Sequence, residues 1–181
     1  MRDQDNSEIQ VYYKYFRAST SQRPAREDTP ATPQPPCNHG YGFQDGDGGM
    51  SVKEECRRSF MEMKWKKVHR YVVYKIDEGS RAVMVDKVGG PGEGYEELAA
   101  SLPIDDCRYA VFDFDFVTVD KCQKSKIFFI TWSPTASRIR AKMLYATSKQ
   151  GLRRVLEGVH YEVQATDPTE MGFDVIRERA K

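Results

Sequence analysis

The sequence lacks the features that would suit a membrane protein or a nucleic-acid binder. No apolar run approaches the roughly 20 residues that a membrane-spanning helix needs, and the first ten residues are too polar for a signal peptide. The 28 Lys and Arg almost balance the 27 Asp and Glu, giving a net charge of +1. Because no overall field draws the chain to a polyanion, we expect a soluble intracellular protein with no nucleic-acid partner.

Cysteine and histidine are also scarce. The sequence has four cysteines, none in a CxxC pair, and three histidines, none with zinc-site spacing. We expect Cys37, Cys56, Cys107 and Cys122 to be reduced cytosolic thiols. The sequence predicts no metal site and no cofactor, and it offers little material for a histidine-based catalytic triad.

The composition changes near residue 50. Residues 1–49 hold five of the nine prolines and five of the thirteen glycines, with little hydrophobic periodicity. Such a segment cannot offset the conformational entropy lost on ordering. The sequence therefore predicts a disordered extension over 1–49 and one folded domain over 50–181, a length that suits a single core.

The pattern within 50–181 alternates between helices and strands. Ser51 and Glu54 have the spacing of a capping box, which predicts a first helix from Ser51 to about Lys66. A second helix is expected at 95–101. Strands are expected where β-branched and aromatic residues gather, with a hairpin turn at 77–80; they are 71–76, 82–88, 109–117, 126–132 and 161–165.

Two further helices follow from serine, aspartate and proline positions. Ser133 followed by Pro134 predicts a helix start, with the helix bent near Thr147 and continuing to Leu156. Asp167 and Pro168 predict the start of a last helix that runs to Ala180. Helices that alternate with a mixed sheet predict an α/β sandwich of three layers.

Two motifs could suggest enzyme chemistry, and neither is complete. Asp113 and Asp115 alternate with phenylalanines, so both carboxylates lie on one face of a strand, about 7 Å apart. No nucleophile or histidine accompanies them, which favours a solvated or ion-paired face over acid–base catalysis. The glycine-rich segment 89–94 lacks the Lys-Ser or Lys-Thr of a phosphate-binding loop. We therefore expect a protein that is not an enzyme.

Cations concentrate in the second half of the domain. Lys124 and Lys126 begin a strand, and three cations begin the long helix; these are Arg138, Arg140 and Lys142. Ile139 and Met143 fall at i and i+4 beside them. A solvated face with Met143 in the core remains an alternative to a protein-binding surface, for which methionine is equally suited.

The segments that carry these cations resemble a known family. They read KSKIFFITWSP over 124–134 and RIRAKMLYATSK over 138–149, and the resemblance continues through DCRYAVFDFDF at 106–116 and QATDPTEMG at 164–172. Together they resemble the actin-depolymerising factor (cofilin) family, in its plant branch, over essentially 50–181. The resemblance implies a five-stranded mixed sheet flanked by helices on both faces, and a protein that binds monomeric and filamentous actin and severs and depolymerises filaments.

The resemblance also implies which residues contact actin. The long helix would enter an actin cleft through Arg138, Arg140, Lys142 and Met143, with Ser51 and Val52 of the N-terminal segment beside it. Lys124 and Lys126 match the family's filament-binding pair, and Arg177 and Arg179 of the last helix would add filament contacts. We expect a basic surface facing acidic actin to bind more weakly as salt rises.

One departure concerns regulation. The family often has a phosphorylatable hydroxyl just before the Gly-Met of its N-terminus, where this chain has Gly48. Ser51 is the candidate phosphosite that remains, because a phosphate in an actin contact would repel acidic actin. Its role in a capping box is the favoured explanation for this serine.

An alternative function is filament bundling or stabilisation. The first helix and its exit are unusually basic, and MKWKKVHR at 63–70 resembles a plant subgroup associated with bundling. A second filament surface would comprise Arg57, Lys64, Lys66 and Lys67. Phosphoinositide binding at the basic patch is compatible with either function. We expect a monomer in the cytoplasm, on the actin cytoskeleton, and the basic run 64–70 also resembles a nuclear import signal.

Overall fold

The computed structural model describes residues 50–118 and 121–180, except for the side chains of the last two. The predicted extension over 1–49 lies outside the described residues. Within them a six-stranded mixed sheet has the order β1-β3-β2-β4-β5-β6. Its strands are β1 (Ser51–Val52), β2 (Tyr71–Asp77), β3 (Ala82–Gly89), β4 (Arg108–Val117), β5 (Gln123–Trp132) and β6 (Tyr161–Ala165).

The sheet is mixed because its two edge strands pair in parallel while the inner pairs are antiparallel. β1 runs parallel to β3, and β6 runs parallel to β5. The β2–β3 and β4–β5 hairpins and the β2–β4 pair are antiparallel. The short β1 adds a strand to the five expected, and the α/β class is confirmed.

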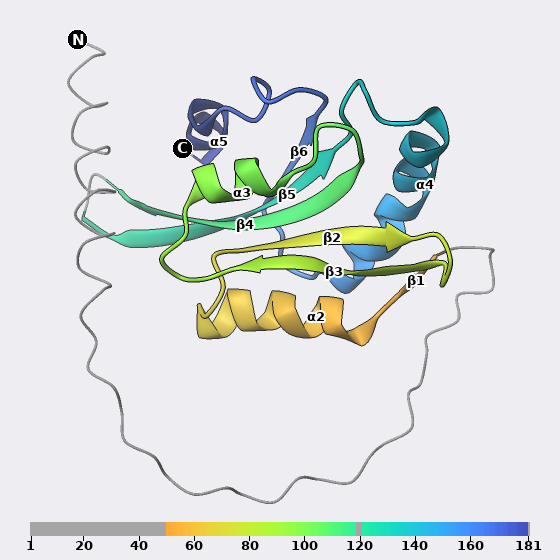
Figure 1. The fold of residues 1–181 in the computed structure, drawn as a ribbon. Helices are drawn as coiled ribbons and strands as arrows, with labels where there is room; N and C mark the ends of the chain where they lie inside the picture. Colours follow the sequence, from red (N-terminus) through yellow and green to blue (C-terminus); the bar gives the residue numbers. More distant parts are fainter. Residues whose placement is uncertain (1–49, 119–120, 181) are drawn as a thin grey trace, which may run out of the picture. The chain divides into compact units, whose positions relative to one another are not determined.

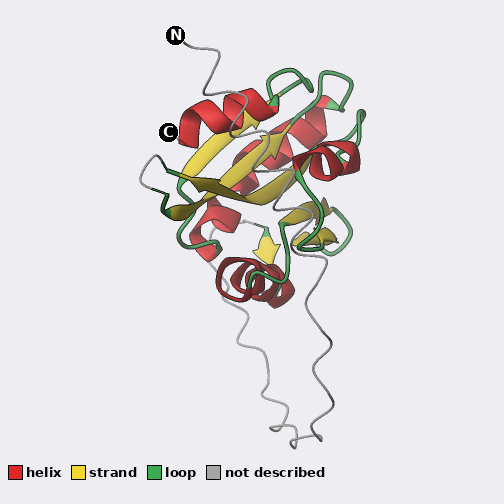
Figure 2. Ribbon diagram, turned by 90° about the vertical axis from the view of Figure 1, so that its left-hand side faces the viewer, coloured by secondary structure: helices red, strands yellow, loops and turns green. Residues whose placement is uncertain are grey.

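Helices cover both faces of the sheet (Figures 1 and 2). One face packs on α3 (Tyr95–Ser101) and α5 (Phe173–Ala180) through a core that includes Phe112, Phe128 and Leu98. The other face packs on α2 (Glu54–Met61), the following π-helix η1 (Glu62–Lys66) and α4 (Ile139–Val155). Along β4, Phe112 and Phe114 enter the first core and Tyr109 and Val111 enter the second, since successive side chains of a strand point to opposite faces.

The predicted capping box at Ser51 is wrong. Ser51 lies in β1, where its N–H donates to the Arg81 carbonyl at 3.1 Å and its hydroxyl approaches the same oxygen at 3.4 Å. The helix begins at Glu54, after Lys53, which gives no side-chain cap. Two acidic residues, Glu54 and Glu55, occupy the first turn instead, and their negative charges interact favourably with the positive end of the helix dipole. Sheet pairing at the edge therefore outweighed the local capping signal.

Two other predicted helix starts are also wrong. Pro134 lies in a turn that Ser137 closes by donating to the Pro134 carbonyl at 2.7 Å, and the buried Cys107 thiol donates to Ser137 at 3.3 Å. This turn delays α4 until Ile139. Asp167 accepts hydrogen bonds from the Thr169 and Glu170 N–H groups, but it caps a separate turn, and α5 begins at Phe173.

Candidate functional site

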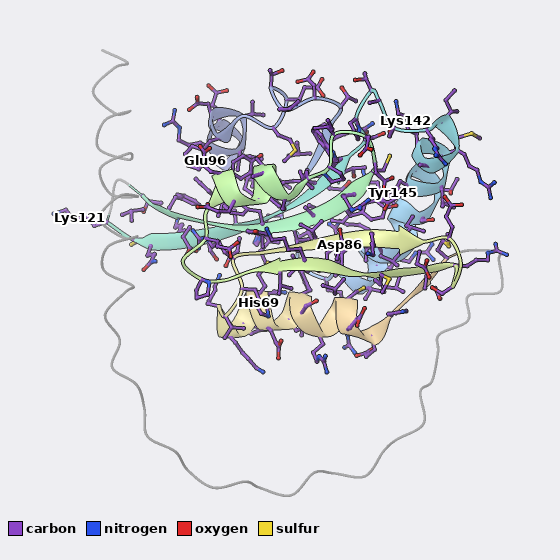
Figure 3. All side chains as sticks on the ribbon, viewed as in Figure 1. His69, Asp86, Glu96, Lys121, Lys142 and Tyr145 are labelled. Atoms are coloured by element: carbon purple, nitrogen blue, oxygen red, sulfur yellow. The ribbon has the colours of Figure 1, made fainter. Side chains whose placement is uncertain are left out.

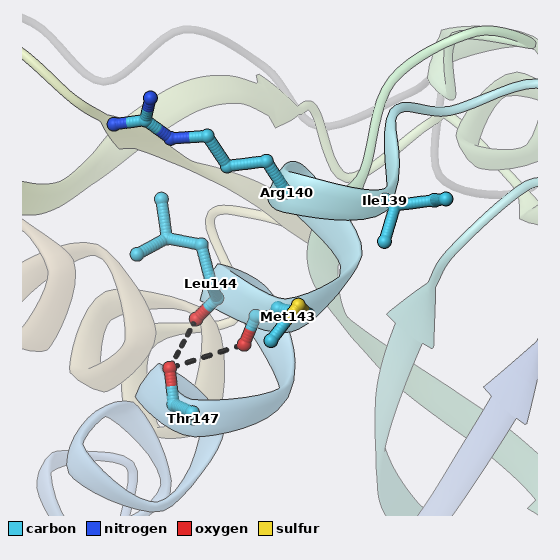
Figure 4. A pocket seen from close by; sticks show the side chains of 5 residues that line it. All are labelled: Ile139, Arg140, Met143, Leu144 and Thr147. Atoms are coloured by element: carbon cyan, nitrogen blue, oxygen red, sulfur yellow. Dashed lines mark hydrogen bonds between the residues drawn. The ribbon is translucent and has the colours of Figure 1, made fainter.

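The first turns of α4 present an apolar and cationic surface to solvent. Ile139 is 78% exposed and Met143 is 65% exposed, so the structure places Met143 on the surface and not in the core. A shallow depression runs along this side of the helix and is lined by Ile139, Arg140, Met143, Leu144 and Thr147 (Figure 4). Large exposed apolar side chains that gather in one place are typical of a protein-binding surface.

The opposite side of α4 fixes the helix to the sheet. The Tyr145 hydroxyl accepts a hydrogen bond from the Ile76 N–H at 2.9 Å, and the Tyr109 hydroxyl donates to the Tyr145 carbonyl. Burial raises the pKa of Tyr145 to about 12, so it stays a neutral phenol. Leu152, two turns further on, is fully buried. These contacts hold the exposed side of the helix in one orientation.

The charges at the start of α4 oppose helix stability. Arg138 is the N-cap residue, Arg140 and Lys142 follow in the first turn, and no acidic residue lies there. The N-terminus of a helix carries a partial positive charge, so each nearby cation costs roughly 0.3–1 kcal/mol. Arg140 is only loosely paired, at 3.7 Å from Glu78, and Lys142 donates to the Thr135 carbonyl. A helix start charged in this way suits an anionic partner that offsets the cost.

β1 lies beside this surface. Ser51 and Val52 pair with Ala82 and Val83 of β3, and β1 also contacts α4. Ser51 is exposed. Ser51 and Val52 therefore lie on a strand that contacts α4, and their joint actin contact with the cations of that helix stays a prediction.

The β4–β5 hairpin carries a second group of cations, on the other face of the sheet. Lys124 and Lys126 lie opposite Phe116 and Phe114 of β4, which places them on the face that α3 and α5 cover. The Lys126 ammonium lies 5.8 Å from the centre of the Tyr161 ring. Lys121, next to the pair, and Lys142 of α4 lie at opposite ends of the domain (Figure 3). The two groups form separate surfaces.

The acidic pair of β4 is ion-paired. The Lys67 ammonium contacts the Asp113 carboxylate and the Arg70 guanidinium contacts that of Asp115. Burial raises the pKa of Asp113, and the hydrogen bond from Lys67 opposes the rise. Within 50–118 and 121–178, no three side chains of His, Cys, Asp or Glu lie close enough to hold a metal ion. The pair therefore joins the exit of the first helix to the sheet.

Each cation of the predicted second surface has a partner inside the domain. Arg57 lies 3.8 Å from Glu54, and Lys66 lies 3.2 Å from Glu62. Lys64 donates to the Glu157 carbonyl at 3.0 Å, and Lys67 contacts Asp113. Three of these four cations are thus paired with carboxylates, and a second filament contact stays a prediction.

Residues 49–181 match the model of the family described as cofilin/tropomyosin-type actin-binding protein. The chain belongs to this family. Actin-depolymerizing factor 5 of Oryza sativa is 86% identical over 133 residues, which cover 74% of this chain and 93% of the relative. Actin-depolymerizing factor 5 of Arabidopsis thaliana is 74% identical over 139 residues, covering 77% of this chain and 97% of the relative.

Solved structures agree with the fold. A cofilin from Streptomyces griseoflavus superposes with a TM-score of 0.68 at 28% identity, covering 74% of this chain and 98% of the other. Actin depolymerization factor 2 of Plasmodium berghei gives 0.64 at 28% identity, covering 72% and 95%. The chain is thus a plant-type member of a family of actin-binding regulators.

In this cofilin-family protein, the last helix leaves Arg177 less exposed than the sequence predicted. The Arg177 side chain is mostly buried and pairs with Asp174 at 2.9 Å. The Arg179 side chain lies outside the described residues. A filament contact by α5 stays a prediction for both.

Sequence reasoning did not select two residues of the α4 depression, Leu144 and Thr147. Leu144 is only partly exposed, and the Thr147 hydroxyl donates to the Met143 and Leu144 carbonyls. Thr147 lies four residues after Met143 and therefore on the same side of the helix, a spacing from which the sequence could have predicted it.

Proposed function

We propose that this protein binds monomeric and filamentous actin through the exposed side of α4 and the adjacent β1, and that it severs and depolymerises filaments. The contact residues are Ser51, Val52, Arg138, Arg140, Lys142 and Met143. The observation that supports this most is the start of α4, where cations that destabilise the helix surround the exposed Ile139 and Met143. An acidic protein surface would offset the charge of the cations and cover the exposed Ile139 and Met143 in the same contact.

The hairpin pair Lys124 and Lys126 would contact the filament in addition to α4. Lys121, next to the pair, and Lys142 of α4 lie at opposite ends of the domain (Figure 3), so the two groups would touch different parts of a filament. A monomer needs only the α4 surface, whereas a filament engages both. Arg177 and Arg179 would reinforce the hairpin on the same face of the sheet. A protein with this role acts on the cytoplasmic actin cytoskeleton.

The test is high-speed co-sedimentation with filamentous actin. The double variant Arg140→Ala and Lys142→Ala should lose filament binding and should no longer move actin into the supernatant. Lys87→Ala, which removes an exposed cation on β3, is the matched control and should behave as the wild type. Binding that survives the double variant would sink the proposal, provided the variant melts as the wild type does.

Two further activities extend the proposal. Filament bundling is favoured by the exposed Trp65 at the exit of the first helix, and low-speed pelleting of filaments tests it because unbundled filaments stay in suspension. Phosphoinositide binding is favoured by the cations of α4 and of the hairpin. Pelleting with liposomes tests it, and pelleting that does not depend on anionic lipid would contradict it.

A further inference from the structure

The β4–β5 hairpin extends beyond the strands that flank it in the sheet (Figure 1). On one side, β6 pairs with β5 only from Phe128 onward. On the other side, the β2 register reaches β4 only as far as Phe112. Residues 123–126 of β5 therefore have β4 on one side and, among the strands of 50–118 and 121–180, no neighbour on the other. We call residues 123–126 the β5 edge.

The strand register decides which backbone groups of the β5 edge point outward. The Ile127 N–H donates to His160 Nδ1 at 2.9 Å, and the Ile127 carbonyl accepts from the His160 N–H at 2.8 Å. Both groups of Ile127 thus point away from β4, and in an antiparallel ladder the direction alternates from residue to residue. The backbone groups of Gln123 and Ser125 therefore also point away from β4. Within the described part of the chain, none of these four groups has a hydrogen-bond partner.

The charges left on the β5 edge are cationic. Lys121 and Lys124 are exposed, and Lys126 is partly exposed. The two carboxylates on the opposite face of β4 already contact Lys67 and Arg70. Lysines on an edge strand oppose pairing with a second copy of the same strand, because like charges would then lie next to each other. The strand that complements this edge is acidic.

We propose that an extended acidic segment of the actin filament adds to β5 as a further strand. Its backbone would bond to the outward N–H and C=O groups of Gln123 and Ser125. Successive side chains of a strand alternate between faces, so carboxylates at every second position would lie on the face of Lys124 and Lys126. This inference rests on the proposed function and specifies how the hairpin takes part in it.

Backbone pairing supplies what the lysines alone do not. Exposed ion pairs between flexible side chains add little affinity and are screened by salt. A strand that is already formed fixes the direction and register of the segment that pairs with it. The lysines then select an acidic segment and speed its encounter with the edge.

The first experiment removes one outward donor from the full chain. Gln123→Pro deletes the N–H that points away from β4, a position where an edge strand tolerates proline. Filament binding in high-speed co-sedimentation should weaken about tenfold. Its salt dependence should stay as in the wild type, because no charge is removed, and binding to monomeric actin should be unchanged. Gln123→Ala, which keeps the N–H, is the matched control and should stay within about twofold of the wild type.

The second experiment uses the wild-type protein. Hydrogen–deuterium exchange with residue resolution should show fast exchange of the Gln123 and Ser125 amides without actin. On filaments the exchange of both amides should slow about tenfold or more, because each gains a hydrogen bond. The Lys124 amide points towards β4 in the same ladder. It should exchange slowly in both samples and serves as the internal control.

The outcomes separate this inference from the proposed function. Unchanged exchange of both amides in a wild type that binds filaments would overturn the strand addition and leave a hairpin that binds through side chains alone. Equal losses in Gln123→Pro and Gln123→Ala would also overturn it, because the glutamine side chain would then carry the effect. If Gln123→Pro loses monomer binding as well, the variant is misfolded and the exchange of the wild type decides. A wild type that does not bind filaments would refute the proposed function and the strand addition with it.

Discussion

The ion pair between Lys67 and Asp113 gives the sharpest test of how the exit of the first helix is held. The Asp113 side chain is 1% exposed and that of Lys67 is 45% exposed. Replacing Lys67 by Met keeps the length of the side chain and the left-handed backbone but removes the charge. Asp113 is then left buried, with Asp115 two residues away on the same strand face.

The magnitude follows from this burial. Removing one partner of a fully buried pair costs about 3–5 kcal/mol, but water can reach the place that the half-exposed Lys67 leaves. We therefore expect Lys67→Met to lower the free energy of unfolding at pH 7 by about 2 kcal/mol. For a domain of this size the melting temperature should fall by about 6–10 °C.

The loss should also depend on pH with a defined sign. Burial already raises the pKa of Asp113, and losing Lys67 raises it further. A carboxyl whose pKa is raised in the folded state adds stability below its unfolded pKa and loses that stability as pH rises through the folded value. The variant should therefore approach the wild type as pH falls from 7 to 5.

Urea unfolding at both pH values measures the effect. Lys66→Met removes the neighbouring charge, whose partner Glu62 is at the surface, and should stay within about 0.5 kcal/mol of the wild type. The double variant Lys67→Met with Asp113→Asn should recover most of the loss at pH 7. A Lys67→Met protein as stable as the Lys66→Met control, or equally destabilised at both pH values, would refute the reasoning.

Three other predictions concern the helix α4, the loop after it and the hairpin. Tyr145→Phe should lower stability by about 2 kcal/mol in urea unfolding, because the buried Ile76 N–H loses its acceptor; an unchanged midpoint would contradict this. Gly158→Ala should lower the free energy of unfolding by about 1–2 kcal/mol, since φ is 91° there and a Cβ would meet the Lys64 ammonium. Gly151→Ala, at an open position of α4, should raise it by about 0.5–1 kcal/mol. Thermal melts compare the two variants, and shifts of the same sign in both would contradict the prediction. Replacing Lys124 and Lys126 by Gln should weaken filament binding about tenfold and reduce its dependence on salt, while binding to monomeric actin stays unchanged. Co-sedimentation at two salt concentrations and a titration of monomeric actin measure this. Equal losses of affinity for filament and monomer would contradict the prediction.

Strands were easier to predict from the sequence than helix starts. The alternating phenylalanines of β4 reflect burial of one face of that strand, a pattern that the sequence carries directly, and β6 was predicted at its observed bounds. Ser51, Ser133 and Asp167 all carried local helix-start signals. In two of the three cases a contact from elsewhere decided otherwise: β3 pairs with Ser51, and Cys107 bonds the turn after Ser133. Asp167 instead caps a local turn through Thr169 and Glu170.

The candidate site was partly predictable for a similar reason. A sequence shows that Lys64 and Lys67 are cations, but their partners, the Glu157 carbonyl and the Asp113 carboxylate, lie far along the chain. Contacts of that kind can be assigned only from the fold. The exposure of Met143 and Trp65 likewise depends on which side of each helix meets the sheet, which spacing alone left open.

Because the sheet separates two cores, the surfaces on its two faces can change independently during evolution. The α4 surface and the exit of the first helix rest on the core that contains Phe60, Met63 and Tyr145. The Lys126 side of the hairpin rests on the other core, with Phe114, Phe128 and the α5 residue Ile176. Mutations in separate cores combine almost additively. Selection can thus change the surface of the hairpin without repacking the core beneath α4, so that related proteins can keep one of the two proposed actin contacts while the other changes.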